Sequence, residues 1–238
     1  MVSAPFPRQD IDCPDPSGCR VAAALPRLRT FTLNSGRPLY RVYDGTWGYD
    51  EHNPGFGDTR FAPIDDPVNR KRLPNMYLGE TPTTVLLETV FHDVHEDGSN
   101  VIYERDLSEK LLAHVRVPIN ATVGDLRDSR LEDYGVARNE VVSSPAEHYP
   151  CTRRLAIAVL AQSHSPPLQG LIWHSRQAEL AGKAQQEVIV LFGERYPSER
   201  GSWQRFPPGS QNLHEGPGRL LVERIAVELG AVIETGAA

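Results

Sequence analysis

The sequence has no long apolar run and little cysteine. None of its hydrophobic stretches approaches the roughly 18 to 20 residues that a membrane-spanning helix needs, and its start lacks the basic and apolar regions of a secretory signal. Its three cysteines are Cys13, Cys19 and Cys151, and no histidine cluster lies beside the first two. This pattern predicts reduced thiols in a cytoplasmic chain, without a zinc site or a disulfide framework.

Positive charge is also scarce. The 238 residues include 25 Lys and Arg against 31 Asp and Glu, which gives a net charge of -6. A protein that binds nucleic acid non-specifically needs clustered positive charge, so neither that function nor a membrane surface is expected. A small anionic ligand bound by a few arginines remains compatible with this charge. The length suits one sizeable domain.

Several motifs of known chemistry are missing. The chain has neither a Gly-x-Gly-x-x-Gly fingerprint after a strand nor a phosphate-binding loop with its lysine. Without a Gly-x-Ser-x-Gly elbow, a serine hydrolase built on Ser175 and His174 is disfavoured, since neighbouring strand residues point to opposite faces. The trio His92, Asp93 and His95 lacks a fourth ligand at suitable spacing, so no metal site is predicted.

The most informative stretch runs from residue 75 to 93. After a short apolar strand, Thr81 can cap a helix and Pro82 suits its first position. Apolar residues then recur at helical spacing, which predicts one buried face. Glu88 lies within this pattern, and a carboxylate beside an apolar face is costly unless it has a partner or a task. Glu88 therefore either pairs with an arginine or carries out chemistry. The apolar positions are Leu87, Val90, Phe91 and Val94.

The rest of the chain predicts a mixed sheet with helices around it. Leu39–Tyr43 alternates like a half-buried strand and would hold Arg41 on a rigid element. Helices are expected at 151–162 and 220–229, the second one ending at Gly230. Further strands are expected at 101–107, 111–118, 121–126, 170–174, 187–192 and 232–233.

Three segments interrupt this regular pattern. Residues 1–28 are rich in Pro, Asp and Ala and are interpreted as an N-terminal arm, followed by one domain over 29–238. Residues 44–74 form a long Gly- and Pro-rich loop whose aromatic side chains favour order, so the loop can form one wall of a pocket. Arg60 is its most suggestive charged residue. Residues 127–150 are polar and are interpreted as an insertion.

Four short motifs, taken in order, resemble the RES-domain family, which is named for an arginine, a glutamate and a serine. The resemblance covers roughly residues 38 to 195, and members of the family include toxins of bacterial toxin–antitoxin pairs. The matching residues are Arg41 in Tyr-Arg, Tyr77 in Met-Tyr-Leu, Glu88 in Leu-Leu-Glu-Thr-Val-Phe-His, and Ser175 in Trp-His-Ser-Arg.

This resemblance implies an α+β fold, a single domain whose mixed, mostly antiparallel sheet resembles that of ADP-ribosyltransferases and is flanked by helices. It also implies an enzyme that consumes NAD as a substrate, with no bound cofactor, by breaking the bond between nicotinamide and ribose. Arg41 would hold the phosphates, Tyr77 would stack near the nicotinamide, Glu88 would stabilise the ribosyl cation, and Ser175 would complete the pocket. Tyr43 and Arg60 are further candidates for binding NAD.

The residue types themselves suit this chemistry. Arginine offers a fork of donors for phosphate oxygens, tyrosine offers a flat ring for stacking, and a carboxylate stabilises an oxocarbenium-like transition state. Compact family members carry Gly-Gly-Arg-Trp where this chain has Asp58-Thr-Arg-Phe61. We therefore expect a different wall on the nicotinamide side.

Several alternatives stay open at this stage. The ADP-ribosyl group can pass to water or phosphate, in a glycohydrolase or phosphorylase, or to a protein, in an ADP-ribosyltransferase. A module that binds NAD or ADP-ribose without turnover is the alternative outside enzymes. The resemblance implies a helix-turn-helix antitoxin as partner, and it leaves open whether two copies of the chain form a homodimer.

Overall fold

The computed structural model of the chain describes residues 10–14, 21, 28–92, 94, 100–183, 185–197 and 200–236. Most of the predicted N-terminal arm at 1–28, Cys19 included, therefore lies outside the described residues. The same holds for Asp93 and His95 of the histidine-containing trio.

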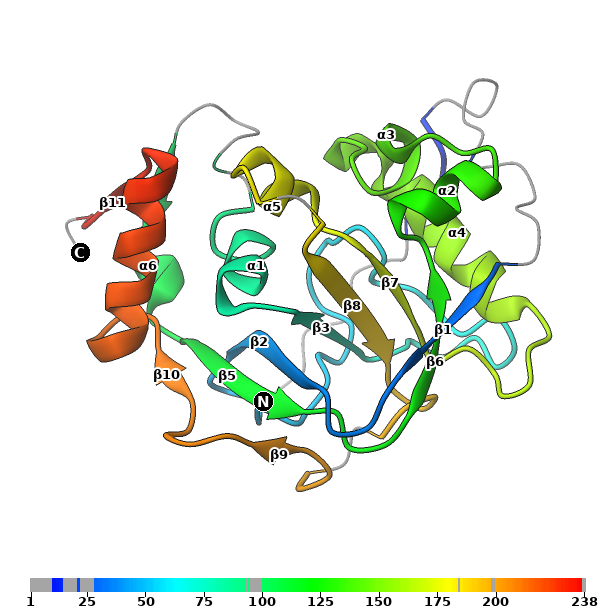
Figure 1. Cartoon of the computed structure of the whole chain (residues 1–238), viewed down its shortest axis with the longest axis horizontal. Coiled ribbons are helices and arrows are strands. Elements are labelled where there is room, and N and C mark those ends of the chain that lie inside the picture. The colour runs from blue at the N-terminus through cyan, green and yellow to red at the C-terminus, as the bar shows by residue number, and fades with distance from the viewer. Residues whose placement is uncertain are drawn as a thin grey trace.

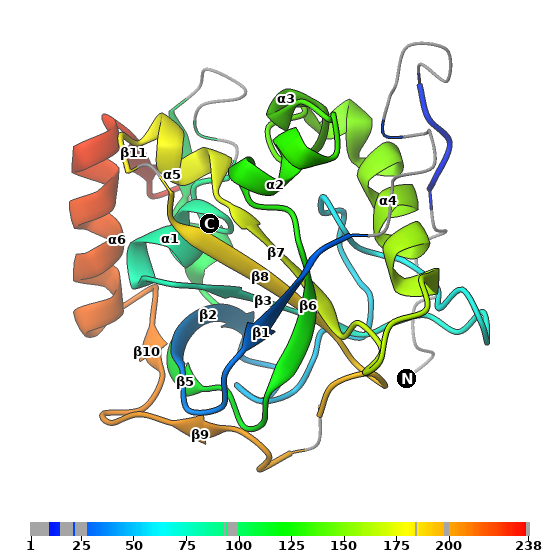
Figure 2. The same cartoon turned by 45° about the vertical axis from the view of Figure 1, so that its right-hand side comes forward.

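One large sheet forms the centre of the molecule (Figures 1 and 2). Its order is β1-β6-β7-β8-β3-β2-β5-β10, and β9 also pairs with β5. Neighbouring strands are antiparallel except for β6 and β7, which are parallel. The predicted α+β fold with a mixed, mostly antiparallel sheet is thus confirmed. The strands are β1 Thr30–Leu33, β2 Pro38–Asp44, β3 Asn75–Gly79, β5 Lys110–Arg116, β6 Ala121–Asp125, β7 Gly170–His174, β8 Glu187–Phe192, β9 Gln204–Arg205 and β10 Gln211–Asn212.

The strand predicted at 101–107 is only half right. Residues Val101–Tyr103 form β4, but Glu104–Leu107 form a short 3-10 helix, η2. Successive strand residues point to opposite faces of a sheet, so the three consecutive charged residues Glu104, Arg105 and Asp106 would place charge on both faces. The chain therefore turns there. β4 pairs in parallel with the last strand, β11 Val232–Glu234, in a separate two-stranded sheet. The expectation that β4 joins the main sheet was therefore wrong.

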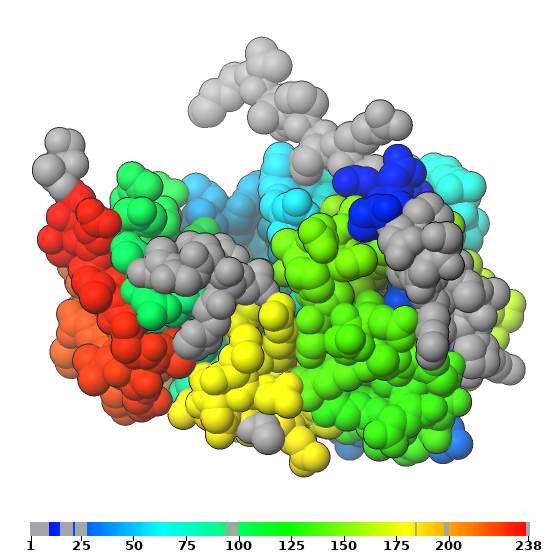
Figure 3. All heavy atoms as spheres, turned by 90° about the horizontal axis from the view of Figure 1, so that it is seen from above, coloured from blue at the N-terminus to red at the C-terminus, as the bar shows by residue number. Residues whose placement is uncertain are grey.

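The helices gather in two groups beside the sheet. In Figure 1, α1, α5 and α6 lie on the side of β2, β5 and β10, whereas α2, α3 and α4 lie beside β1, β6 and β7. Seen from above, α6 in red, α5 in yellow and the segment of α2 to α4 in green follow one another across the surface (Figure 3). No helix in the described ranges is long and apolar enough to cross a membrane. The helices are α1 Pro82–Leu87, α2 Asp128–Asp133, α3 Arg138–Val141, η3 Ala146–His148, α4 Tyr149–Ala161, α5 Arg176–Leu180 and α6 Gly216–Leu229.

The sheet is covered on both faces. In β8, Val188, Val190 and Phe192 join the apolar cluster that contains α4, and the alternate residues Ile189 and Leu191 join the cluster on the opposite face. A strand that is buried on both sides consists of consecutive apolar residues, which is how the sequence of β8 reads.

The helix that precedes the site is shorter than predicted. Its start is as expected, with Thr81 accepting a hydrogen bond from the backbone N–H of Thr84 and Pro82 in the first position. The helix ends at Leu87, however, and Glu88 is its C-cap. Thr89 Oγ1 donates a 2.7 Å hydrogen bond to the Val85 carbonyl, a local alternative that weakens helices. Glu88 thus lies where the chain leaves the helix.

Candidate active site

A hollow opens where β2 and β3 separate. These strands share one register pair, Tyr40 with Gly79. Further along β3, Asn75 pairs with Asn53 of the 44–74 loop. The gap between the strands becomes a cleft of about 760 Å³, a volume within the usual range for small-molecule sites. Its lining includes Arg41, Tyr43, Asn75, Tyr77 and Glu88.

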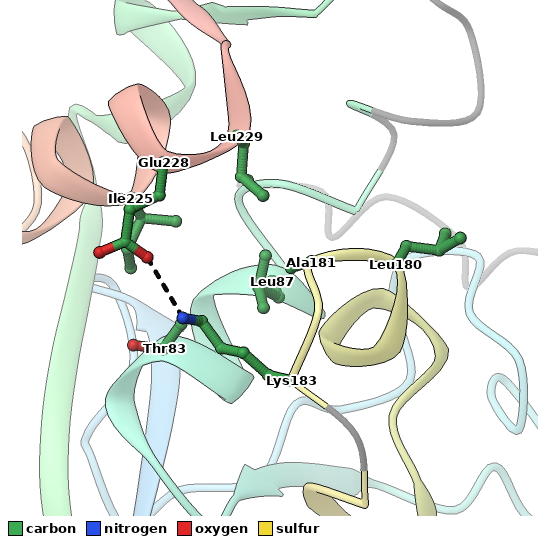
Figure 4. Close-up of a pocket in the computed structure, with 8 residues that line it drawn as sticks. All are labelled: Thr83, Leu87, Leu180, Ala181, Lys183, Ile225, Glu228 and Leu229. Atoms are coloured by element: carbon green, nitrogen blue, oxygen red, sulfur yellow. Dashed lines mark hydrogen bonds and ion pairs between the residues drawn. The ribbon is translucent and has the colours of Figure 1, made fainter.

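Two smaller hollows do not collect the predicted residues. One of about 170 Å³ lies between α1, α5 and α6, with an ion pair of 3.2 Å between Lys183 and Glu228 at its edge (Figure 4). The other, of about 540 Å³, is lined by Arg127, which is already paired with Asp125 at 2.7 Å and with Glu187 at 2.6 Å. The hollow between α1, α5 and α6 is too small for a dinucleotide. In the other hollow, the charge of Arg127 is neutralised by Asp125 and Glu187.

Glu88 is held in the main cleft by Ser175. Ser175 Oγ donates a hydrogen bond to Glu88 Oε1 and accepts one of 2.9 Å from the backbone N–H of Ala178. Ser175 is fully buried and caps the N-terminus of α5, so its hydroxyl has a fixed direction. Glu88 is half-buried and lines the cleft. The serine therefore acts on the cleft through the carboxylate that it orients.

This geometry differs from that of a serine hydrolase. The His174 ring lies beside Asp128, with Nδ1 at 3.2 Å from a carboxylate oxygen. Ser175 is bonded to Glu88. The two side chains leave the strand in different directions, as expected for neighbours.

Arg41 is a buried cation at the β2 side of the cleft. It is 5% exposed, and its Nη1 donates hydrogen bonds of 2.8 and 3.0 Å to the carbonyls of Tyr49 and Glu51. No carboxylate in the described part of the chain forms an ion pair with it. Burial lowers the pKa of Arg41 to about 10, and nearby acidic groups oppose this shift. Arg41 thus stays charged at neutral pH, without a direct counter-ion.

Arg41 donates to carbonyls of the 44–74 loop, and the two carboxylates near Arg41 form hydrogen bonds with backbone N–H groups instead of with Arg41. Asp50 accepts a hydrogen bond from the backbone N–H of Gly201, and Glu51 accepts one of 2.5 Å from that of Gly48. The loop is consequently fixed, and it lines the cleft with Trp47, Asn53 and residues 56–60. The predicted role of this loop as a pocket wall is confirmed.

Tyr77 offers its ring to the cleft, because its hydroxyl is already engaged. The hydroxyl hydrogen-bonds with Thr59 Oγ1 at 2.8 Å and accepts a bond of 3.2 Å from the backbone N–H of Phe61. Burial raises the pKa of Tyr77 well above its ordinary value, so the hydroxyl stays protonated. The ring meets Trp173 edge-on, with 6.0 Å between centroids. Both rings line the cleft.

Arg60 lies near Glu88 but is largely committed to the protein. Its Nη1 donates to the carbonyls of Val141 and Ser144 and to Ser144 Oγ, over 2.7 to 3.0 Å. Its guanidinium also lies over the Tyr149 ring, 5.0 Å from the centroid. Burial lowers the pKa of Arg60 below its ordinary value, although Tyr149 and Glu88 act in the opposite direction. Arg60 therefore adds positive potential at the Glu88 end of the cleft.

The segment at 127–150 builds part of the site. Its backbone receives the bonds from Arg60, and Ala146 lines the cleft beside Tyr149. The Tyr149 hydroxyl lies 2.9 Å from Nε2 of His92, which also lines the cleft. Sequence reasoning missed Tyr149, although an aromatic residue next to a helix-starting proline was a usable signal.

The cleft has two chemically distinct ends. The charged and phenolic groups that affect Arg60 are Tyr149, Glu88, Arg176 and Tyr77, whereas those around Arg41 are Tyr43, Asp50 and Glu51. The Tyr43 hydroxyl donates a 2.7 Å hydrogen bond to Ser210 Oγ, and the centroid of its ring lies 5.2 Å from the Arg41 guanidinium. One end thus presents the Glu88 carboxylate, aromatic rings and the Arg60 guanidinium, whose donors are largely used within the protein, and the other presents the buried Arg41 guanidinium.

These observations define an α+β protein with a mostly antiparallel sheet and a cleft between β2 and β3. The model of the family described as RES domain matches residues 38–203. The chain therefore belongs to the RES-domain family, and the predicted resemblance is confirmed.

The chain is similar to a solved structure over most of its length. A chain of the crystal structure of the M. tuberculosis MbcT–MbcA toxin–antitoxin complex matches with a TM-score of 0.53 and 15% identity, over 87% of this chain and 95% of that one. At this identity the likeness shows a shared fold. No curated protein matches the chain.

Proposed function

We propose that the chain is an NAD-consuming enzyme that cleaves the bond between nicotinamide and ribose, as a glycohydrolase or phosphorylase. The observation that carries this proposal is Glu88, oriented by Ser175 in the same cleft as Arg41, a buried cation without a direct counter-ion. A dinucleotide supplies a ribose for the first and a diphosphate for the second. Membership of the RES-domain family supports the same substrate.

The reaction assigns a role to each side chain. The bond between the anomeric carbon and the nicotinamide nitrogen breaks, and its electron pair leaves with the nicotinamide. The positive charge that develops on the ribose lies against the Glu88 carboxylate, which stabilises it. Tyr77 and Trp173 offer rings against the nicotinamide. An oxygen of water or phosphate then bonds to the anomeric carbon; a water molecule gives up a proton in this step.

NAD turnover by the purified chain tests the proposal. We expect nicotinamide release in step with NAD loss. A rate that rises with inorganic phosphate, with ADP-ribose-1-phosphate as product, identifies a phosphorylase, and free ADP-ribose identifies a glycohydrolase. Transfer of label from NAD to protein would instead identify an ADP-ribosyltransferase. Binding of NAD without any turnover would identify a binding module, and absence of both would contradict the proposal.

We also propose that the chain acts as a toxin restrained by an antitoxin of the helix-turn-helix class. The support is its family and its fold similarity to a chain of a toxin–antitoxin complex. Expression of the chain in a bacterial host is expected to stop growth together with a fall in cellular NAD. Growth arrest without loss of NAD, or arrest that persists in Glu88→Gln, would contradict an NAD-consuming toxin.

A further inference from the structure

Two buried hydrogen-bond donors of residues that line the cleft have no partner in the described part of the protein. They are Nε of Arg41 and Nδ2 of Asn75. Arg41 is 5% exposed and Asn75 is 3% exposed, and both line the cleft. Sequence reasoning singled out Arg41 but passed over Asn75, the polar first residue of an otherwise apolar strand.

Such donors are uncommon in folded proteins. Burying a polar group without a hydrogen bond costs free energy, and most buried groups find a partner in the protein or in bound water. The backbone of Asn75 is fully used, since its N–H and carbonyl both bond with Asn53 at 2.8 Å. The backbone pairing thus fixes the position of Asn75 without engaging its side-chain amide. The side-chain amide therefore keeps a donor available for an acceptor on a bound ligand.

The position of these donors decides what the acceptor is. Arg41 lies on β2 and Asn75 on β3, the two strands that separate to form the cleft. Arg41 carries a charge without a direct carboxylate partner, so a negatively charged oxygen satisfies both its charge and its free donor direction. His52, buried beside Arg41, adds no positive charge, because burial and Arg41 lower its pKa to about 3.

We propose that Asn75 Nδ2 and Arg41 Nε together bind a phosphate oxygen of the dinucleotide, with Asn75 as an additional substrate-binding residue. This inference rests on the proposed function. With Glu88 at the ribose next to nicotinamide, the diphosphate extends toward Arg41 and Asn75. The adenosine then lies beyond it, toward Trp47, a 40% exposed ring on the cleft lining.

Replacement of Asn75 separates binding from stability. Asn75→Leu removes the donor while keeping a similar shape, and Asn75→Asp places a negative charge where the phosphate lies. Binding is measured by calorimetry in the Glu88→Gln background, in which turnover is expected to be about 10³-fold slower. The probes are NAD, nicotinamide mononucleotide and nicotinamide riboside, which carry two, one and no phosphates. Asn34→Asp, in the exposed turn between β1 and β2, is the charge-matched control.

We expect Asn75→Leu to weaken NAD binding by about 10-fold or more and Asn75→Asp by more than that. Neither change should alter the affinity for nicotinamide riboside. The thermal stability of Asn75→Leu should equal or exceed that of the unaltered chain, because a buried donor without a partner has been removed. A residue with a purely structural role would give the opposite pattern, with lower stability and unchanged affinity.

Each outcome decides the matter. NAD affinity within twofold of the unaltered chain in both variants would overturn the inference, as would an equal loss for nicotinamide riboside. If Asn75→Leu fails to fold, Asn75→Ser, which is smaller and polar, is measured in its place. If the chain with unaltered Asn75 neither binds nor cleaves NAD, the proposed function itself fails. If the chain with unaltered Asn75 binds and cleaves NAD and the Asn75 variants have the same affinity for NAD, the proposed function stands and only the role of Asn75 fails.

Discussion

Glu88→Gln is expected to lower the turnover number for NAD by about 10³-fold while leaving the fold intact. Glutamine has the size of glutamate and can still accept the hydrogen bond from Ser175, but it lacks the negative charge that stabilises the ribosyl cation. Loss of one well-placed electrostatic contact of this kind costs two to three orders of magnitude. The measurement is nicotinamide release at saturating NAD, with circular dichroism and a melting curve to verify folding.

Two further variants sharpen this result. Ser175→Ala keeps the charge but releases the carboxylate from the hydroxyl that orients it, and we expect a smaller loss of about 10- to 100-fold. Glu132→Gln removes a carboxylate from an exposed position of α2 and should leave turnover unchanged. Near-normal turnover in folded Glu88→Gln would exclude the assigned role. A Ser175→Ala loss as large as that of Glu88→Gln would show that the hydroxyl does more than orient the carboxylate.

Asp66→Ala is expected to lower the free energy of unfolding by about 3 to 5 kcal/mol. Asp66 accepts hydrogen bonds of 3.1 and 2.8 Å from Nε and Nη2 of Arg195, and both side chains are largely buried. Arg195 also donates to the carbonyls of Leu160 and Leu168, near the end of α4. Removing one partner of a buried pair leaves the other charge uncompensated, which carries a cost of this size.

Urea denaturation of the two proteins measures the difference. Asp133→Ala is the matched control, since Asp133 meets Arg130 at 3.4 Å on the surface, where such a pair contributes about 1 kcal/mol or less. Equal stability of Asp66→Ala and the unaltered chain would show that solvent already screens the Asp66–Arg195 pair.

The same pair sets a pH dependence. Burial raises the pKa of Asp66, but hydrogen bonds from Arg195 and from the backbone N–H groups of Val68 and Asn69 lower it further, so the pKa lies below its ordinary value. A lowered pKa in the folded state gives stability that is present above the pKa of the unfolded chain, about 3.9. That stability is lost as the pH falls through the folded-state pKa. The difference between Asp66→Ala and the unaltered chain should therefore shrink in strong acid.

The elements that follow from local pattern were predictable from the sequence. β7 and β8 have the predicted bounds, because runs of buried apolar residues allow little else. Gly230 ends α6 in the left-handed conformation, with φ +65°, as a C-terminal glycine does. The start of α1 at Thr81 and Pro82 followed from capping chemistry.

What depends on distant contacts was not predictable. The spacing of Val90, Phe91 and Val94 suggested a continuing helix, but the chain turns after Leu87, and the Leu86 carbonyl accepts from Val90 and from Phe91. Phe91 and Val94 are nevertheless buried, and Val90 is partly buried against the same cluster. The partner of β4 is the last strand, more than 120 residues away, which no local pattern reveals.

The same distinction between local pattern and distant contacts applies to the candidate site. Short motifs identified Arg41, Tyr77, Glu88 and Ser175 as candidates, and the structure gathers them in or directly beside one cleft. The roles assigned to them remain predictions. Tyr149 and Asn75 escaped notice because their importance comes from what lies opposite them after folding. Likewise, the polar segment at 127–150 contributes to the site through the backbone carbonyls that it offers to Arg60 and through Ala146 and Tyr149 on the cleft lining.

The single register pair between β2 and β3 has a mechanical consequence. The main sheet consists of one block of strands from β1 to β3 and another from β2 to β10, in the order of the sheet. Few backbone hydrogen bonds join the two blocks, because β2 and β3 share one register pair. Arg41 belongs to one block, whereas Tyr77 belongs to the other and Glu88 follows it in the chain. A dinucleotide that contacts all three residues would connect the two blocks. Bound substrate would then help to hold the two parts of the sheet together.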